Sequence, residues 1–372
     1  MSRFLLAHSR GGSPETLLAD CLRQLGDVPA HANFGFVFAT DALTPALASI
    51  LAQLKAHTAI THWVGSVGVG INTTMHEYYD APALAVMLAS LPPDSFRVMP
   101  SQHDAVDDYL ASIAPWLARN EFHFGMLHAD PNNETAPAII EQLAARVPGA
   151  FFVGGLSSAQ GEHVQIANTL VAGGVSGVLF GPEVAVVTSH TQGCTPLGPA
   201  HVITACERNI LIELDRRPAL EVFCADIGEV LARDLTQVGG YIFAGFPVVG
   251  SDTGDYVVRN LLGIDRERQW LALGEFLTPG RSLLFCRRDG NSARQDLERM
   301  LADLRRRMGT APKGAVYYSC LGRGRQQFGA DSAELRMIAA ALGDLPLVGF
   351  FANGEIFHNR LYGYTGVLTI FC

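Results

Sequence analysis

The stretch VYYSCLGRGR at residues 316–325, followed by LVGFFANGEI at 347–356, decides the fold of this chain. Each stretch is an apolar run that ends in a polar, glycine-rich loop, and a helical pattern at 334–342 lies between them. Corresponding strand positions are about 30 residues apart, a length that suits one β-α-β unit with a right-handed crossover. We therefore expect two neighbouring parallel strands joined by a helix.

The same pattern occurs twice earlier in the chain, so the sequence contains an internal repeat. The earlier copies place strand, helix and strand at 34–38, 46–54 and 63–70, and at 122–127, 136–147 and 151–158. Each copy continues into a further apolar run, at 83–88, 175–180 and 364–371. We expect this run to pair with the strand just before it as a hairpin, which makes the sheets mixed. The predicted class is mixed α/β, built from repeated β-α-β units.

Between the second and third copies the pattern changes. Short apolar segments separated by turn signals predict an antiparallel meander that opens the C-terminal half. They lie at 184–188, 209–213, 256–262, 270–273 and 282–286. An amphipathic helix is expected over 289–306. The charged, proline-containing DRRP at 215–218 breaks the apolar pattern, so we predict two domains, 1–217 and 218–372.

Composition excludes several classes of protein. The chain has 372 residues, 48% hydrophobic content and 38 glycines, which suits two folded domains. A net charge of −9, with one basic run at 305–307, argues against a nucleic-acid partner. Seven cysteines without metal-ligand spacing argue against a disulfide scaffold and favour a reducing cytoplasm. The apolar runs are too short or too interrupted for export or for spanning a membrane.

The two C-terminal loops carry the main candidates for a ligand site. Arg323 and Arg325 offer forked donors to a carboxylate, phosphate or amide, while Glu355 suits an ammonium group or fixes Arg323. The neighbouring loop positions Gly322, Gly324, Asn353 and Gly354 let the backbone close around a bound group. The alternative interpretation is a tight turn whose arginines are solvated or pair with Glu355.

Other candidate residues each have two interpretations. Cys320 ends a strand before two arginines, where positive charge favours a reactive thiolate, yet burial as a packing or ligand-lining residue is the commoner outcome. Cys194 has the same ambiguity and is interpreted as structural. Arg259 projects from one face of a strand, toward the same site or into a surface pair. The pair Ser157 and Ser158 resembles a hydroxyl-bearing ligand loop, although serines after Gly-Gly are also common in turns.

The order and spacing of nine short motifs resemble the FIST domain family, with its N-terminal and C-terminal regions. They are GGLSS (154–158), GVLF (177–180), QGCTPLG (192–198), IELD (212–215), PAL (218–220), YVVRN (256–260), GID (263–265), CLGRG (320–324) and GFFANGEI (349–356). The resemblance implies an intracellular sensory domain that binds small ligands, with amino acids or related metabolites proposed for the family. Relatives are often fused to kinase, cyclase or methyl-accepting output modules. Since this sequence ends at Cys372, we expect a separate partner, such as a histidine kinase, to read its state.

Two alternatives stay open. Some FIST-type proteins are described as haem-based gas sensors, but the twelve histidines of this chain form no ligand cluster in the sequence. A cysteine-dependent enzyme would use Cys320 as its nucleophile, but the chain has no Gly-x-Ser-x-Gly elbow, Walker loop or complete dinucleotide fingerprint. We favour ligand binding over catalysis and predict no cofactor, with haem kept as the alternative. The predicted protein binds a small polar metabolite, with Arg323 on an anionic group and Glu355 on a cationic one.

Overall fold

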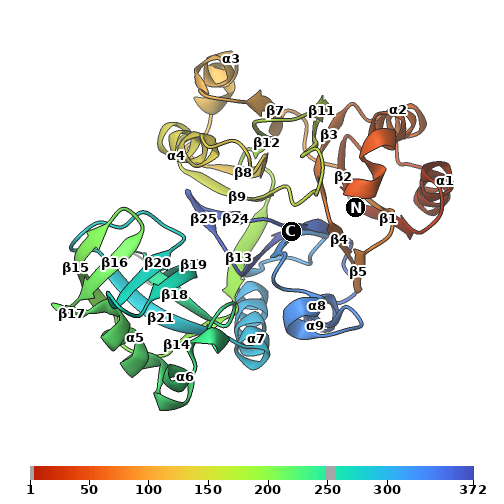
Figure 1. Cartoon of the computed structure of the whole chain (residues 1–372). Helices are drawn as coiled ribbons and strands as arrows, with labels where there is room; N and C mark the ends of the chain where they lie inside the picture. Colours follow the sequence, from red (N-terminus) through yellow and green to blue (C-terminus); the bar gives the residue numbers. More distant parts are fainter. Residues whose placement is uncertain (1–3, 249–255) are drawn as a thin grey trace. The chain divides into compact units, whose positions relative to one another are not determined.

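The computed structural model describes residues 4–248 and 256–372, which divide into two compact units (Figure 1). The first unit contains the chain up to Thr191 together with Leu297–Leu361 and Thr365–Cys372, and the second contains Gln192–Asp296 and Tyr362–Tyr364. Residue 217 therefore does not separate the compact units. The reason is that most of the second unit lies in the sequence between the second and third copies of the repeat, and the strands of the third copy return to the first unit.

Each predicted β-α-β copy is present, and its two strands are parallel neighbours. The three copies are β2 (Phe34–Thr40), α2 (Leu47–Thr58) and β3 (His62–Gly68); β8 (His123–Ala129), α4 (Ala136–Arg146) and β9 (Ala150–Leu156); and β22 (Gly314–Cys320), α9 (Ala333–Leu342) and β23 (Leu347–Ala352). The mixed α/β class predicted from the repeat is confirmed.

The further strand of each copy does not pair where we predicted. The strands β6 (Ala83–Ala89), β12 (Val175–Phe180) and β26 (Thr365–Phe371) pair antiparallel with the first strand of their copy, not with the preceding second strand. A hairpin from another copy takes the free edge of the second strand. The hairpin β4–β5 (Gly70–Thr73, His76–Tyr79) joins β23, β10–β11 (Gln165–Ala167, Thr169–Val171) joins β3, and β24–β25 (Glu355–Phe357, Arg360–Tyr362) joins β9.

The exchange of hairpins gives three six-stranded sheets of equivalent strand order. Each sheet starts at an edge strand, β1 (Leu5–Arg10), β7 (Phe96–Gln102) or β13 (Val186–Gln192). The orders are β1-β6-β2-β3-β10-β11, β7-β12-β8-β9-β24-β25 and β13-β26-β22-β23-β4-β5. Every copy therefore contributes strands to two sheets, and the first unit can only be completed when all three copies are folded.

Successive side chains along each strand point to opposite faces of its sheet, so one face packs into a shared inner core and the other packs under the helices. Phe38, Met126 and Tyr318, one from each sheet, belong to the shared inner core. The opposite faces of the first two sheets pack against α1 (Pro14–Leu25) and α2, and against α3 (Asp107–Leu117) and α4, as Figure 1 shows. The Val-Gly of each copy is explained by close packing, since a Cβ on Gly65 would lie 1.7 Å from the Val37 carbonyl oxygen.

The second unit contains the predicted antiparallel meander, closed by a pairing between β18 and β21. Its strands are β14 (Cys194–Pro196), β15 (His201–Glu207), β16 (Ile210–Leu214), β17 (Arg217–Pro218), β18 (Ile242–Pro247), β19 (Tyr256–Asp265), β20 (Trp270–Leu273) and β21 (Ser282–Arg288). Of the strand predicted at 184–188, residues 186–188 form the start of β13, the edge strand of the third sheet in the first unit.

The remaining helices connect or cover these sheets. The long helix α7 (Gly290–Arg307) confirms the amphipathic pattern predicted over 289–306. Shorter helices are α5 (Ala219–Ile227), α6 (Glu229–Arg233), α8 (Arg325–Phe328), and the 3-10 turns η1 (Asp41–Ala46) and η2 (Leu235–Gln237). Over the described ranges, every helix is too short or too polar to cross a bilayer.

Candidate ligand-binding site

Arg323 lies in the interior, in an ion pair with a carboxylate that the sequence analysis did not single out. Its guanidinium is fully buried, and Nε and Nη2 lie 2.8 and 2.7 Å from Oε1 of Glu334. The ring of Phe328 packs 5.0 Å from the guanidinium carbon. The alternative partner considered for Arg323, Glu355, is therefore not its ion-pair partner.

Glu334 is the centre of a buried hydrogen-bond network at the C-terminal end of β22. Its carboxylate accepts hydrogen bonds from the Tyr317 hydroxyl at 2.6 Å, the Ser319 hydroxyl at 3.1 Å and the Gly324 backbone N–H at 3.0 Å, besides Arg323. A fully buried charge is tolerated only when it is paired and hydrogen-bonded in this way. In the sequence, Glu334 is recognisable only as an acid between apolar residues at the start of the helix predicted over 334–342.

A second buried carboxylate, Glu77, reaches this network from the first copy. It lies on β5, in the exchanged hairpin that pairs with β23. The Tyr79 hydroxyl donates to Glu77 Oε2 at 3.3 Å, whereas Oε1 is buried and has no hydrogen-bond partner among the described residues. Burial, and then the negative charge of Glu334, raise the pKa of Glu77 to about 8.

The surface above Glu77 is formed by an exposed ion pair. The Arg325 guanidinium stacks 4.4 Å above the centre of the Tyr79 ring and forms a bidentate ion pair with Asp80. The hydrogen bond to Asp80 raises the pKa of Arg325, and the same bond lowers the pKa of Asp80. Of the two predicted guanidiniums, Arg325 is the one that solvent reaches, since its side chain is 43% exposed.

Glu355 and Cys320 form a separate part of the same buried region. Glu355 Oε2 accepts hydrogen bonds from the Thr365 backbone N–H at 3.1 Å and from its hydroxyl at 2.7 Å. Burial raises the pKa of Glu355 to about 8, against the opposing effects of Thr365, the Arg323 charge and a hydrogen bond with the Cys320 thiol. Arg323 and Glu355 thus lie within electrostatic reach of each other, as the sequence analysis expected, but neither is exposed.

The predicted serine pair lies where strand ends of the three copies meet. The Ser157 hydroxyl donates to the Val67 carbonyl at 2.8 Å. The Ser158 hydroxyl accepts from the Val69 backbone N–H at 3.1 Å and donates to the carbonyl of Phe351. Both serines are buried, so in this structure their hydroxyls join the copies to one another.

The other predicted residues are distributed between the two units. Backbone groups of Asn353 and Gly354 bond across to Leu156, and a Cβ on Gly324 would lie 2.2 Å from the Tyr79 hydroxyl. Gly322 lies in the turn between β22 and α8. In the second unit, Arg259 pairs with Glu275 at 2.6 Å, and Cys194 is buried beside Cys286 and hydrogen-bonded to it. The structure therefore gathers the C-terminal candidates and leaves Arg259 and Cys194 in a separate unit.

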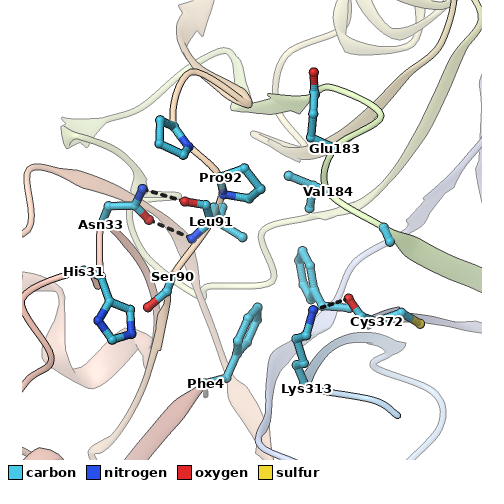
Figure 2. A pocket seen from close by; sticks show the side chains of 13 residues that line it. Phe4, His31, Asn33, Ser90, Leu91, Pro92, Glu183, Val184, Lys313 and Cys372 are labelled. Atoms are coloured by element: carbon cyan, nitrogen blue, oxygen red, sulfur yellow. Dashed lines mark hydrogen bonds between the residues drawn. The ribbon is translucent and has the colours of Figure 1, made fainter. Parts of the chain in front are cut away.

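A cavity of about 470 Å³ lies elsewhere in the first unit, near the N-terminal ends of β2 and β22 (Figure 2). Its lining combines apolar side chains with a few polar ones: Phe4, His31, Asn33, Ser90, Leu91, Pro92, Pro93, Glu183, Val184, Ala185, Lys313, Phe371 and Cys372. None of these residues was singled out as a site residue from the sequence, because none belongs to a motif and most come from loops beside the predicted strands.

The comparisons assign the family. The FIST N domain model matches residues 33–217 and the FIST C domain model matches residues 219–358, so this chain belongs to the FIST family. FIST domains are sensory, ligand-binding domains of signalling proteins. The chain is 29% identical to an uncharacterized protein of Mycobacterium tuberculosis H37Rv, over 95% of this chain and 97% of that one. It is 28% identical to an uncharacterized Mycobacterium bovis protein, over 89% and 87% of the two chains.

Two buried histidines, His128 and His123, are held by neighbouring groups of the fold. His128 donates or accepts a hydrogen bond with the Tyr318 hydroxyl at 3.1 Å, and its ring packs against Phe38 and Phe350 at centroid distances of 5.6 and 6.0 Å. A haem macrocycle would have to displace these rings. The His123 ring lies 2.9 Å from the Pro148 carbonyl oxygen. Within residues 4–248 and 256–372, no three His, Cys, Asp or Glu side chains form a metal-binding group.

Proposed function

We propose that this FIST protein is a sensor for a small polar metabolite with a cationic or zwitterionic head, such as an amino acid. The proposed site is the charged region at the C-terminal end of β22, where the family motif CLGRG meets the exchanged hairpin. Both the membership of the sensory FIST family and the charge of this region support the proposal.

The observation that carries the proposal is the incomplete pairing of Glu77. Its carboxyl group is buried beside the negative Glu334, and Oε1 has no hydrogen-bond partner among the described residues. A buried polar atom left without a partner costs about 1–3 kcal/mol. With its pKa raised to about 8, the Glu77 carboxyl group holds a proton at neutral pH, and an ammonium group beside it would favour the ionised form and supply a donor to Oε1. In this proposal the site therefore favours ligands that carry a cationic group.

Arg325 is suited to bind the other end of a zwitterion. Among the described residues, its accessible guanidinium stacks on Tyr79 and forms an ion pair with the exposed Asp80, and exposed ion pairs contribute little to stability. In this proposal a ligand carboxylate exchanges with Asp80, and the ligand's ammonium group displaces Tyr79 to meet the buried Glu77 carboxyl group. In this proposal Arg325 takes the role that the sequence analysis gave to Arg323, and Arg323 instead positions Glu334.

Isothermal titration with a panel of amino acids, matched carboxylic acids and matched amines tests the proposal. We expect a zwitterion to bind, and expect Arg325→Met and Glu77→Gln each to weaken binding at least tenfold. Arg217→Met is the matched control, because Arg217 forms a similar exposed pair with Glu221 in the second unit. Equal affinity in all three variants, or the absence of binding by every zwitterion and amine, would reject this site.

We further propose that a separate signalling protein, such as a histidine kinase, reads the occupied state. The α8 segment that carries Arg325 lies at the surface, where rearrangement of the Arg325–Asp80 pair changes what a partner meets. Affinity capture from a lysate should recover a partner whose yield depends on the ligand in the parent protein but not in Arg325→Met. Capture that is identical with and without ligand would contradict the proposal.

A further inference from the structure

The cavity of Figure 2 is a second candidate site, distant in the fold from the charged region. The charged region lies at the C-terminal end of β22, whereas the cavity lies where β22 begins, next to Lys313. Its volume of about 470 Å³ is within the range of small-molecule sites, roughly 300–1,000 Å³.

The cavity is built from all three copies. The first copy contributes the loop after β6, and the second contributes the loop between β12 and β13. The third contributes the start of β22 and the end of β26, which lie side by side in an antiparallel pair. Backbone hydrogen bonds hold these segments together, from the Cys372 N–H to the Ala185 carbonyl at 2.9 Å and from the Lys313 N–H to the Phe371 carbonyl at 2.8 Å. Asn33 fixes the remaining wall through two hydrogen bonds with Leu91, of 3.0 and 2.9 Å.

The lining is apolar on its walls and charged at two points. Phe4, Leu91 and Phe371 are nearly fully buried and provide the apolar surface. Figure 2 shows Lys313 and Glu183 on opposite sides of the cavity, so a bound anion is attracted by Lys313 without lying beside the Glu183 carboxylate.

Lys313 has hydrogen-bonding capacity to spare. Its ammonium group is exposed and donates one hydrogen bond, of 2.7 Å, to a backbone oxygen of Cys372, and an ammonium group has three donors. The lining also includes the Ser90 hydroxyl, whose oxygen is buried without a hydrogen-bond partner among the described residues. The cavity therefore offers an apolar interior, a cation at one side and an unsatisfied hydroxyl.

We propose that this cavity binds an amphipathic monocarboxylate, with its hydrocarbon chain against Phe4, Leu91 and Phe371 and its carboxylate on Lys313. Because the walls come from three copies, the ligand stabilises their association. The proposed site is independent of Glu77 and Arg325, so a failure of one site leaves the other unaffected.

The small number of lysines allows a direct test. Lys313 and Lys55 are the two lysines of the chain, and Lys55 does not line the cavity. Reductive ¹³C-methylation labels both side chains, so NMR titration with hexanoate, octanoate and decanoate below their micellar concentrations reports each lysine separately. We expect a saturable shift of the Lys313 signal and a constant Lys55 signal. Affinity should rise roughly fourfold for each added methylene group.

Calorimetry on unlabelled protein compares three substitutions and a second ligand. Lys313→Met should weaken octanoate binding about tenfold, Lys55→Met should leave it unchanged, and octylamine should bind more weakly than octanoate. Ala185→Phe should fill the cavity and abolish binding by octanoate. The proposal is overturned if octylamine binds as tightly as octanoate, if both lysine signals shift alike, or if Lys313→Met and Lys55→Met have the same affinity.

Discussion

The buried ion pair of Arg323 and Glu334 leads to the most demanding prediction. Glu334→Gln retains the shape of the side chain but removes the charge that accepts two contacts from Arg323, at 2.8 and 2.7 Å. The hydrogen bonds from Tyr317 and Ser319 would then end on a neutral amide. Since the guanidinium is fully buried, its charge is left without compensation. Breaking such a pair costs about 3–5 kcal/mol in the free energy of unfolding.

A double-mutant cycle separates this penalty from a simple loss of packing. Arg323→Met removes the stranded charge, so the double variant Arg323→Met/Glu334→Gln should be destabilised by about 2 kcal/mol less than the sum of the single variants. Urea unfolding followed by circular dichroism measures all four proteins. A loss below about 1 kcal/mol for Glu334→Gln, or strict additivity in the cycle, would refute the reasoning that this charge is buried and paired.

Three other predictions follow from the core. The pKa values of Glu77 and Glu355 are raised from 4.5 to about 8, so the folded state retains protons that the unfolded state releases, and the free energy of unfolding should fall as the pH rises from about 4.5 to 8. Urea titrations should show a weaker fall in Glu77→Gln. Burial lowers the pKa of His128 to about 3, so below pH 6.5 the unfolded state binds a proton that the folded state does not, and the free energy of unfolding falls. His128→Phe should therefore lose less stability between pH 6.5 and 4 than the parent protein. Gly65→Ala should destabilise the fold by more than about 2 kcal/mol, because its Cβ would meet a carbonyl oxygen of the neighbouring strand at 1.7 Å. Gly161→Ala, with open space around its Cβ, should not, and thermal unfolding compares the two variants.

The candidate site was predictable in part. The motif CLGRG and the carboxylate Glu355 do belong to one buried region, because both lie at the ends of strands in the same repeat copy. The partner of Arg323 was not predictable from spacing. Glu334 and Glu355 follow the motif CLGRG in the third copy, whereas Glu77 lies in the first copy. Which of these acids meets the guanidinium depends on how the hairpins and α9 pack.

The cavity is a second feature that the sequence did not predict. Its apolar residues carry no motif, and Lys313 stands before a predicted strand as an ordinary charged residue. Its position became significant only when loops following β6 and β12 were found beside the start of β22. A cavity is a property of the packing between segments, so a pattern within one segment does not reveal it.

The sequence by itself determined the three β-α-β copies, the antiparallel meander and the long helix α7. Those features depend on the alternation of apolar residues and on turn residues within short segments, which act locally. Tertiary structure alone decided the exchange of hairpins between copies, the insertion of the second unit and the partner of Arg323. Such pairings depend on contacts between distant positions, as between Glu77 and Ser332, which are 255 residues apart and joined by a 2.8 Å hydrogen bond.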